Sequence, residues 1–191
     1  MMVQPTISSE QALNAVQAQV DVPTAYRLVT TDLEPQNERT VWRLRHERRD
    51  RKNVGLGGEH VTLVVDAVTR ALLGVTKMVG DLAEGDLPTK NAAQQTAMRF
   101  IEEVAPDLEN QLEVLWIEPH DEVVQIAEQS VALTGMKVKM QQQDGRYAWV
   151  IVGARNAVIT FERDIIWNYD MSKRTTEKWL HDSWISSRVG V

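Results

Sequence analysis

The residues best suited to chemistry lie in one short run, Glu118-Pro119-His120-Asp121-Glu122. An imidazole beside carboxylates can bind a divalent cation or act as a general acid and base pair. Neighbouring positions do not converge on one point from a helix, however, and the sequence has no second histidine-rich segment to complete a set of metal ligands. Carboxylates in the first turn of a helix, stabilised by its dipole, explain the same residues without a function. We therefore predict no catalytic residue and no metal site here.

Other residue types associated with chemistry are present but lack the required spacing. His181-Asp182-Ser183 holds the members of a hydrolase triad, yet consecutive residues cannot adopt that geometry, and the sequence has no Gly-x-Ser-x-Gly elbow. Gly57-Gly58 is not followed by the lysine and hydroxyl of a phosphate-binding loop. His46 and His60 are expected on paired strands beside this turn, where they could face each other; we interpret them as solvated hairpin residues. No cofactor is predicted.

The tryptophans are more informative than the polar motifs. The sequence has six in 191 residues, more than a core of this size normally needs. Several belong to strands that should adjoin in one sheet and would form an aromatic groove for a peptide, glycan or flat ligand, although burial in the core is the alternative for each. Arg163, with Lys173 and Arg174, could flank such a surface and favour an acidic partner. The candidate ligand- or partner-binding residues are Trp116, His120, Trp149, Arg163 and Trp167.

Composition limits the class of protein. With 43% apolar and 25% charged residues, the chain can bury one good-sized core or two small ones. A net charge of −6 argues against a nucleic-acid-binding protein, because neutralising phosphates is the main source of affinity there. The basic residues between 43 and 52 are interleaved with Glu47 and Asp50, so we expect them on an exposed hairpin. The absence of cysteine excludes disulfides and thiolate chemistry.

Targeting signals are also missing from the sequence as written. Residues 1–7 have neither a basic nor an apolar leader region, and no run approaches the roughly 18 apolar residues that would span a bilayer. We expect a soluble, cytoplasmic chain, or an extracytoplasmic one if a leader has been removed.

Hydrophobic patterning predicts the elements that would position these residues. In the first half, Ser8 and Gln11 form a capping box for a short helix, a polar connection covers residues 32–38, and Gly80 to Asp86 is the candidate domain boundary. In the second half, Thr89 caps a helix that ends at Val104. Residues 119–135 are either helix closed by Gly135 or strand and loop, and residues 175–184 are predicted as a terminal helix. The predicted strands are 26–31, 40–46, 60–66, 71–78, 112–118, 136–140, 147–152, 158–163 and 165–169, the last three forming a meander.

The two halves repeat one order of elements, a capped helix followed by antiparallel strands. We therefore predict an α+β protein of two similar lobes, residues 1–84 and 85–191, with a short C-terminal helix. Each lobe would pack one helix on an antiparallel sheet of three to four strands, and the lobes would share one sheet or pack face to face. Sheet faces without a helix must be buried, so either the lobes pack together or the chain forms a homodimer.

The repeated unit resembles the PepSY domain and, more loosely, the tandem PepSY-like repeats of the YcdB/YcdC type. The resemblance lies in Trp42-Arg43-Leu44-Arg45 as the family's W-x-V strand, in residues 64–73 as its V-D-A-x-T-G-x-V-L ending, and in residues 91–100 as its A-x-x-A-x-x-F helix. Arg70 stands where the family has glycine, the second copy lacks the Asp-Ala-x-Thr-Gly form, and the family's secretory leader is missing. The resemblance implies a binding or regulatory role rather than catalysis.

Two functional hypotheses follow. The first is a non-enzymatic interaction or regulatory module that binds protein or peptide on a sheet face or edge. The alternative is a small-molecule-binding protein or hydrolase with a site at the lobe interface, using Trp116, Glu118, His120 and Asp121. A structural domain cut from a larger envelope protein is a third interpretation.

Overall fold

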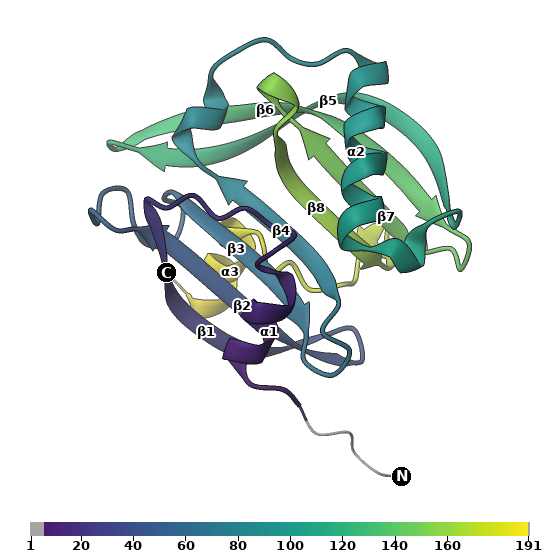
Figure 1. Cartoon of the computed structure of the whole chain (residues 1–191), viewed down its shortest axis with the longest axis horizontal. Helices are drawn as coiled ribbons and strands as arrows, with labels where there is room; N and C mark the ends of the chain where they lie inside the picture. Colours follow the sequence, from purple (N-terminus) through teal and green to yellow (C-terminus); the bar gives the residue numbers. More distant parts are fainter. Residues whose placement is uncertain (1–5, 191) are drawn as a thin grey trace.

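The computed structural model describes residues 6–190 and shows a mixed α+β protein, as predicted. Within that range the chain forms three α-helices, an eight-stranded antiparallel sheet and a two-stranded sheet (Figure 1). The strands of the large sheet lie in the order β1-β2-β3-β4-β8-β7-β6-β5, so the last strand of each half pairs at the centre. They are β1 (Tyr26–Gln36), β2 (Arg39–Arg48), β3 (His60–Asp66), β4 (Leu72–Met78), β5 (Leu112–Ile126), β6 (Gln129–Gln142), β7 (Tyr147–Val152) and β8 (Val158–Ile165).

Short elements and helices connect and cover these strands. The helices are α1 (Ser9–Val16), α2 (Lys90–Val104) and α3 (Asp182–Val189), and the small sheet pairs β9 (Trp167–Asn168) with β10 (Lys173–Arg174). The 3-10 turns are η1 (Gly80–Ala83), η2 (Pro106–Leu108) and η3 (Ala154–Asn156). Both predicted caps are present: the Ser8 hydroxyl accepts the Gln11 N–H, and the Thr89 hydroxyl accepts the Ala92 N–H, each at 3.2 Å.

Helices α1 and α2 lie on one face of the large sheet and α3 on the other (Figure 1). One apolar core runs beneath α1 and α2 and contains strand residues from both halves of the chain. Val75 and Phe161 face each other where β4 pairs with β8, and the Phe161 ring meets Phe100 of α2 edge to face at 5.6 Å. Alternation along each strand sends the intervening side chains to the other face.

The C-terminal segment packs its apolar side chains on the other face of the first four strands. Trp179, Leu180 and Ile185 pack there against apolar residues of β2, β3 and β4. Gly74 makes room for this contact, because a Cβ at that position would lie 2.8 Å from Leu180 Cδ1. The same face of β5 to β8 carries no α-helix of the described chain. Instead, η1 packs on its apolar residues, and the β9–β10 segment reaches Lys139 and Trp149.

Of the two alternatives for residues 119–135, strand and loop is confirmed and the helix is not formed. The segment contains the continuation of β5, a turn at Ala127-Glu128 and the start of β6, because a long hairpin pairs every residue from Glu118 to Ile126 with β6. Two other predictions of secondary structure are wrong. No strand of the meander follows β8, which instead runs through Arg163-Asp164 to Ile165, and β9 pairs with β10. The polar connection 32–38 is mostly strand, since β1 continues to Gln36 along β2.

The terminal helix begins later than predicted. Residues 175–181 precede α3 and are held by long-range hydrogen bonds, including Trp179 Nε1 to the Pro35 carbonyl at 2.7 Å. Thr176 Oγ1 likewise bonds the Asn37 side chain at 2.8 Å. These tertiary contacts compete with the local helical pattern and outweigh it.

The first-half histidines and basic residues are also placed differently from the prediction. His46 lies opposite Val61 and His60 opposite Glu47, so the two imidazoles point to opposite faces, and both are buried rather than solvated. Arg45, expected on an exposed hairpin, is buried and pairs with Asp182 and Glu47. The C-terminal segment supplies the carboxylate that makes this burial possible.

Candidate functional site

The register of the sheet brings aromatic and cationic side chains together on the face without α2. Trp116 of β5 pairs with Lys139 of β6, Lys139 with Trp149 of β7, and Trp149 with Glu162 of β8. Lys137 lies two residues before Lys139 and shares its face. We call this surface the aromatic-lysine face; it consists of Trp116, Lys137, Lys139, Tyr147, Trp149 and Trp167.

The two lysines of this face are held by aromatic rings rather than by carboxylates. Lys139 Nζ lies 5.4 Å from the ring centre of Trp116, 4.8 Å from that of Tyr147 and 5.9 Å from that of Trp167. Lys137 Nζ lies 4.2 Å from the ring of Trp149. Among residues 6–190, neither ammonium has a carboxylate within 4.0 Å, and burial lowers the pKa of Lys137. The two ammonium groups are therefore unpaired at ion-pair distance, although the charges of Glu162 and Glu122 partly offset the effect of burial on the pKa of Lys137.

A buried ion cluster borders the face where it meets the C-terminal segment. Glu162 accepts hydrogen bonds from Arg174 at 2.7 and 3.1 Å and from Trp149 Nε1 at 3.1 Å, and it lies 3.1 Å from His181 Nε2. Burial alone would raise the pKa of Glu162, but the charges of Arg174 and His181 outweigh it and hold that pKa well below its ordinary range. Burial alone would lower the pKa of His181, and Glu162 raises it overall. The cluster thus satisfies its own charges and leaves those of the lysines free.

An open groove of about 430 Å³ runs beside this cluster. His120, Trp149 and Trp167 line it, together with Glu122, Lys137, Arg174, Lys178, His181, Ser183 and Trp184. His120 Nε2 lies 3.1 Å from a carboxylate oxygen of Glu122, two residues along the same strand, so it is part of a strand surface and not of a helix start. Four of the five residues singled out in the sequence, Trp116, His120, Trp149 and Trp167, therefore lie on or next to one surface.

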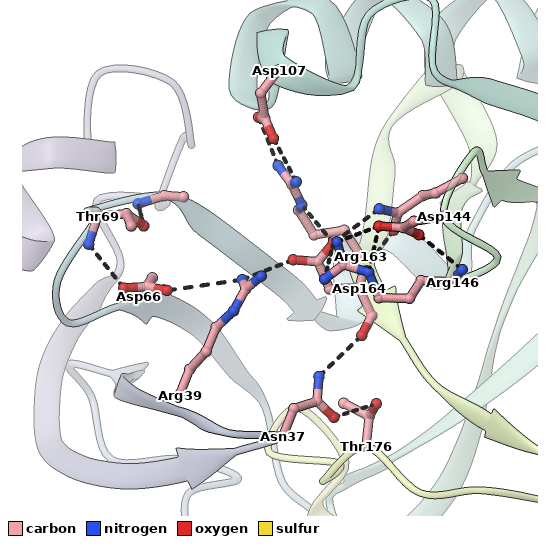
Figure 2. A network of polar contacts seen from close by, with 12 residues as sticks. Asn37, Arg39, Asp66, Thr69, Asp107, Asp144, Arg146, Arg163, Asp164 and Thr176 are labelled. Atoms are coloured by element: carbon pink, nitrogen blue, oxygen red, sulfur yellow. Dashed lines mark hydrogen bonds and ion pairs between the residues drawn. The ribbon is translucent and has the colours of Figure 1, made fainter.

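Arg163 lies on the opposite face of the sheet, because it directly follows Glu162 in β8. Its guanidinium donates two hydrogen bonds to Asp107 after α2, at 2.7 and 2.6 Å. Figure 2 shows it inside a network centred on Asp164, whose carboxylate also bonds Arg39 at 2.8 Å. Arg39 in turn lies 3.8 Å from Asp66. This network joins the turns of both halves of the chain. The Arg163 guanidinium is therefore engaged in contacts within the protein and does not flank the tryptophans.

A second cavity, of about 400 Å³, lies between the glycine-rich turn, β5 and α3. Three acidic residues line it, Asp121, Glu122 and Asp182. Asp182 accepts hydrogen bonds from Arg45 and from the Gly57 N–H, each at 2.7 Å. His60 bonds Thr62 Oγ1 at 2.7 Å, and burial lowers its pKa to about 3. Within the described chain Ser183 makes no hydrogen bond to either histidine. These groups hold the glycine-rich turn against α3.

Sequence reasoning missed the lysines and the ion cluster. The alternation of Met136-Lys137-Val138-Lys139-Met140 carried the signal for the lysines, because it places both on one face of a strand. No comparable signal exists for Glu162 with Arg174 and His181, which come from separate elements.

Comparison with known proteins gives a likeness of fold. No protein-family model and no curated protein matches the chain. The structure is similar to the Bacillus megaterium YpeB C-terminal domain, with a TM-score of 0.56 and 11% sequence identity over 83% of this chain. The match spans 64% of that chain. The likeness is compatible with the PepSY-like fold that the sequence motifs suggested.

Two further properties of residues 6–190 bear on other kinds of site. No helix there is both long and apolar enough to cross a bilayer. No group of three or more histidine and acidic side chains is arranged to hold a metal ion in that range.

Proposed function

We propose that this chain is a non-enzymatic interaction module that binds a protein or peptide on the aromatic-lysine face. The observation that supports this most is a sheet face with large, partly exposed rings and with cations that have no carboxylate within 4.0 Å among the described residues. Trp116 and Trp167 are 39% and 40% exposed, although tryptophan is costly to leave in water. Tryptophan is also enriched among the residues that contribute most to binding energy at interfaces.

We further propose that the chain consists of two PepSY-like lobes, residues 1–84 and 85–191, joined through β4 and β8. Each half supplies one helix and then four consecutive antiparallel strands. Antiparallel pairing of β4 with β8 relates the halves by an approximate two-fold rotation, with Val75 and Phe161 at matching places. The C-terminal segment breaks this relation because its apolar residues pack on the sheet face of the first lobe.

The alternative, a hydrolase or small-molecule-binding protein, has less support from the geometry. A hydrolase needs a nucleophile within hydrogen-bond reach of a base. The cavity beside Asp182 contains Ser183 and two histidines. Among the described residues, these histidines bond Thr62 and Glu162, and neither bonds Ser183. The groove beside Trp149 is open, and an open groove suits an extended or helical segment better than a small ligand.

Selection of a random peptide library on the purified chain tests the proposed function. We expect peptides to be enriched whose binding is lost in the double variant Trp116→Ala/Trp167→Ala. Leu28→Ala is the matched control, because Leu28 is 38% exposed on β1 at the opposite edge of the sheet. Circular dichroism verifies that each variant is folded. Failure to enrich any peptide, or equal loss of binding in the control, would reject the proposal.

A further inference from the structure

The hydrogen-bond register places one cation from each half of the sheet in the same row across the strands. Gly74 of β4 pairs with Glu162 of β8 at the centre. Outward from Gly74, the row continues through Val64 of β3 to Arg43 of β2. Outward from Glu162, it continues through Trp149 to Lys139. The two-fold rotation centred on the Val75–Phe161 pair carries Gly74 onto Thr160 and Thr76 onto Glu162, so it exchanges this row with the neighbouring one.

The neighbouring row holds the counterparts of these two cations. Thr76 pairs with Thr160 at the centre. One side of this row leads through Thr62 to Arg45, and the other leads through Ile151 to Lys137. Arg43 is therefore equivalent to Lys137, and Arg45 to Lys139. Each half presents two cations, two residues apart on its second strand, on the face without α1 and α2.

In the first half, the chain's own C-terminal segment occupies this face and contacts both cations. Arg45 donates a hydrogen bond to the Asp182 carboxylate at 2.7 Å. The Arg43 guanidinium carbon lies 5.9 Å from the ring centre of Trp179. Leu180 sits between them, against Gly74 and in the same apolar cluster as Val64. The segment therefore brings one carboxylate, one indole and one leucine to the cations and to the strands between them.

In the second half, the two equivalent cations have rings beside them, and the acids of the same face, including Glu118 opposite Lys137, lie beyond ion-pair distance. Lys137 and Lys139 have no acidic group within 4.0 Å among the described residues. Glu162, the buried acid of this face, is already bonded to Arg174 and His181. The missing component is thus a carboxylate, and Trp116, Trp149 and Trp167 supply apolar surface for the side chains next to it.

We infer that the aromatic-lysine face binds a peptide segment that carries a carboxylate close to an aromatic or leucine side chain, the chemistry of this chain's own residues 179–185. The carboxylate pairs with Lys137 or Lys139, and the apolar side chains pack on the indole rings. This inference rests on the proposed function and names the class of partner. Removing the carboxylate removes a charge-assisted hydrogen bond and weakens binding about tenfold.

Fluorescence anisotropy of a labelled peptide tests the inference. The probe has the sequence of residues 176–188, TEKWLHDSWISSR, and is titrated with the full chain. We expect saturable binding that falls about tenfold when the peptide aspartate is replaced by asparagine, or when the chain carries Lys137→Gln. Combining the two changes should cost no more than either alone, because they remove the same pair. Lys139→Gln provides a second measurement if Lys137→Gln does not fold.

Lys90→Gln is the control variant, because Lys90 is exposed at the start of α2 on the other side of the sheet. Unchanged affinity in both Lys137→Gln and Lys139→Gln, or equal binding of the asparagine peptide, would overturn the inference. A concentration-dependent dimer that Lys137→Gln dissociates would also overturn it, in favour of a second copy of this chain.

The two proposals fail in different ways. If the peptide library yields neutral or basic sequences whose binding depends on Trp116 and Trp167, the acidic partner is wrong and the interaction module stands. If no sequence binds in a manner that depends on those tryptophans, both proposals fail.

Discussion

Glu162 is the residue whose replacement should cost the most stability for the smallest change in shape. It is 3% exposed, and its carboxylate joins Arg174, Trp149 and His181. Glu162→Gln keeps the volume but removes the charge that neutralises the buried Arg174. Breaking a buried ion pair by removing one partner costs about 3–5 kcal/mol. Glutamine retains one oxygen that can accept a hydrogen bond, so we expect a loss of free energy of unfolding near 3 kcal/mol.

Urea denaturation at pH 7, followed by tryptophan fluorescence, measures this loss. With a slope of about 2 kcal/mol per molar urea, the midpoint should fall by roughly 1.5 M. Asp144→Asn is the matched control, because Asp144 pairs with Arg146 at the surface and such pairs contribute about 0–1 kcal/mol.

A midpoint for Glu162→Gln no lower than that of Asp144→Asn would refute the reasoning. The double variant Glu162→Gln/Arg174→Met provides a further test. Removing the orphaned guanidinium as well should recover part of the loss, because the penalty arises from a buried charge without a partner. No recovery would mean that packing, and not charge, accounts for the effect.

Two further predictions concern a close contact and a buried imidazole. Gly135→Ala should lower the free energy of unfolding by about 1–3 kcal/mol in the same assay, because its Cβ would lie 2.5 Å from Ile151 Cγ2. An unchanged urea midpoint would mean that β6 and β7 accommodate the added methyl group without loss of stability. His60 has a folded-state pKa of about 3. Between that value and its unfolded pKa the unfolded state alone binds the proton, so the stabilisation present at pH 7 is lost as pH falls. At pH 5 this loss reaches up to about 2 kcal/mol, and His60→Gln should show a correspondingly smaller change between pH 7 and pH 5.

Local patterns in the sequence determined the elements whose signals are contained within a few residues. Strands β3 and β7 begin and end where alternation and β-branched residues predicted them. The Ser8 and Thr89 caps bond neighbouring backbone groups, so no distant residue is needed to form them. The α+β class follows from such elements, because helices and strands with one apolar face must pack on each other.

Tertiary structure decided everything that depends on pairing between distant residues. The length of β5 is set by its partner β6, and the start of α3 by the contacts of Trp179 and Thr176 with the β1 end of the sheet. The sequence placed Arg163 with the tryptophans, whereas β8 turns it toward Asp107. Side-chain partners across a sheet follow from register, and register is chosen by the packing of the whole core. That choice places Trp116, Lys139 and Trp149 in one row across the sheet. It leaves Lys139 without a carboxylate within ion-pair distance among the described residues.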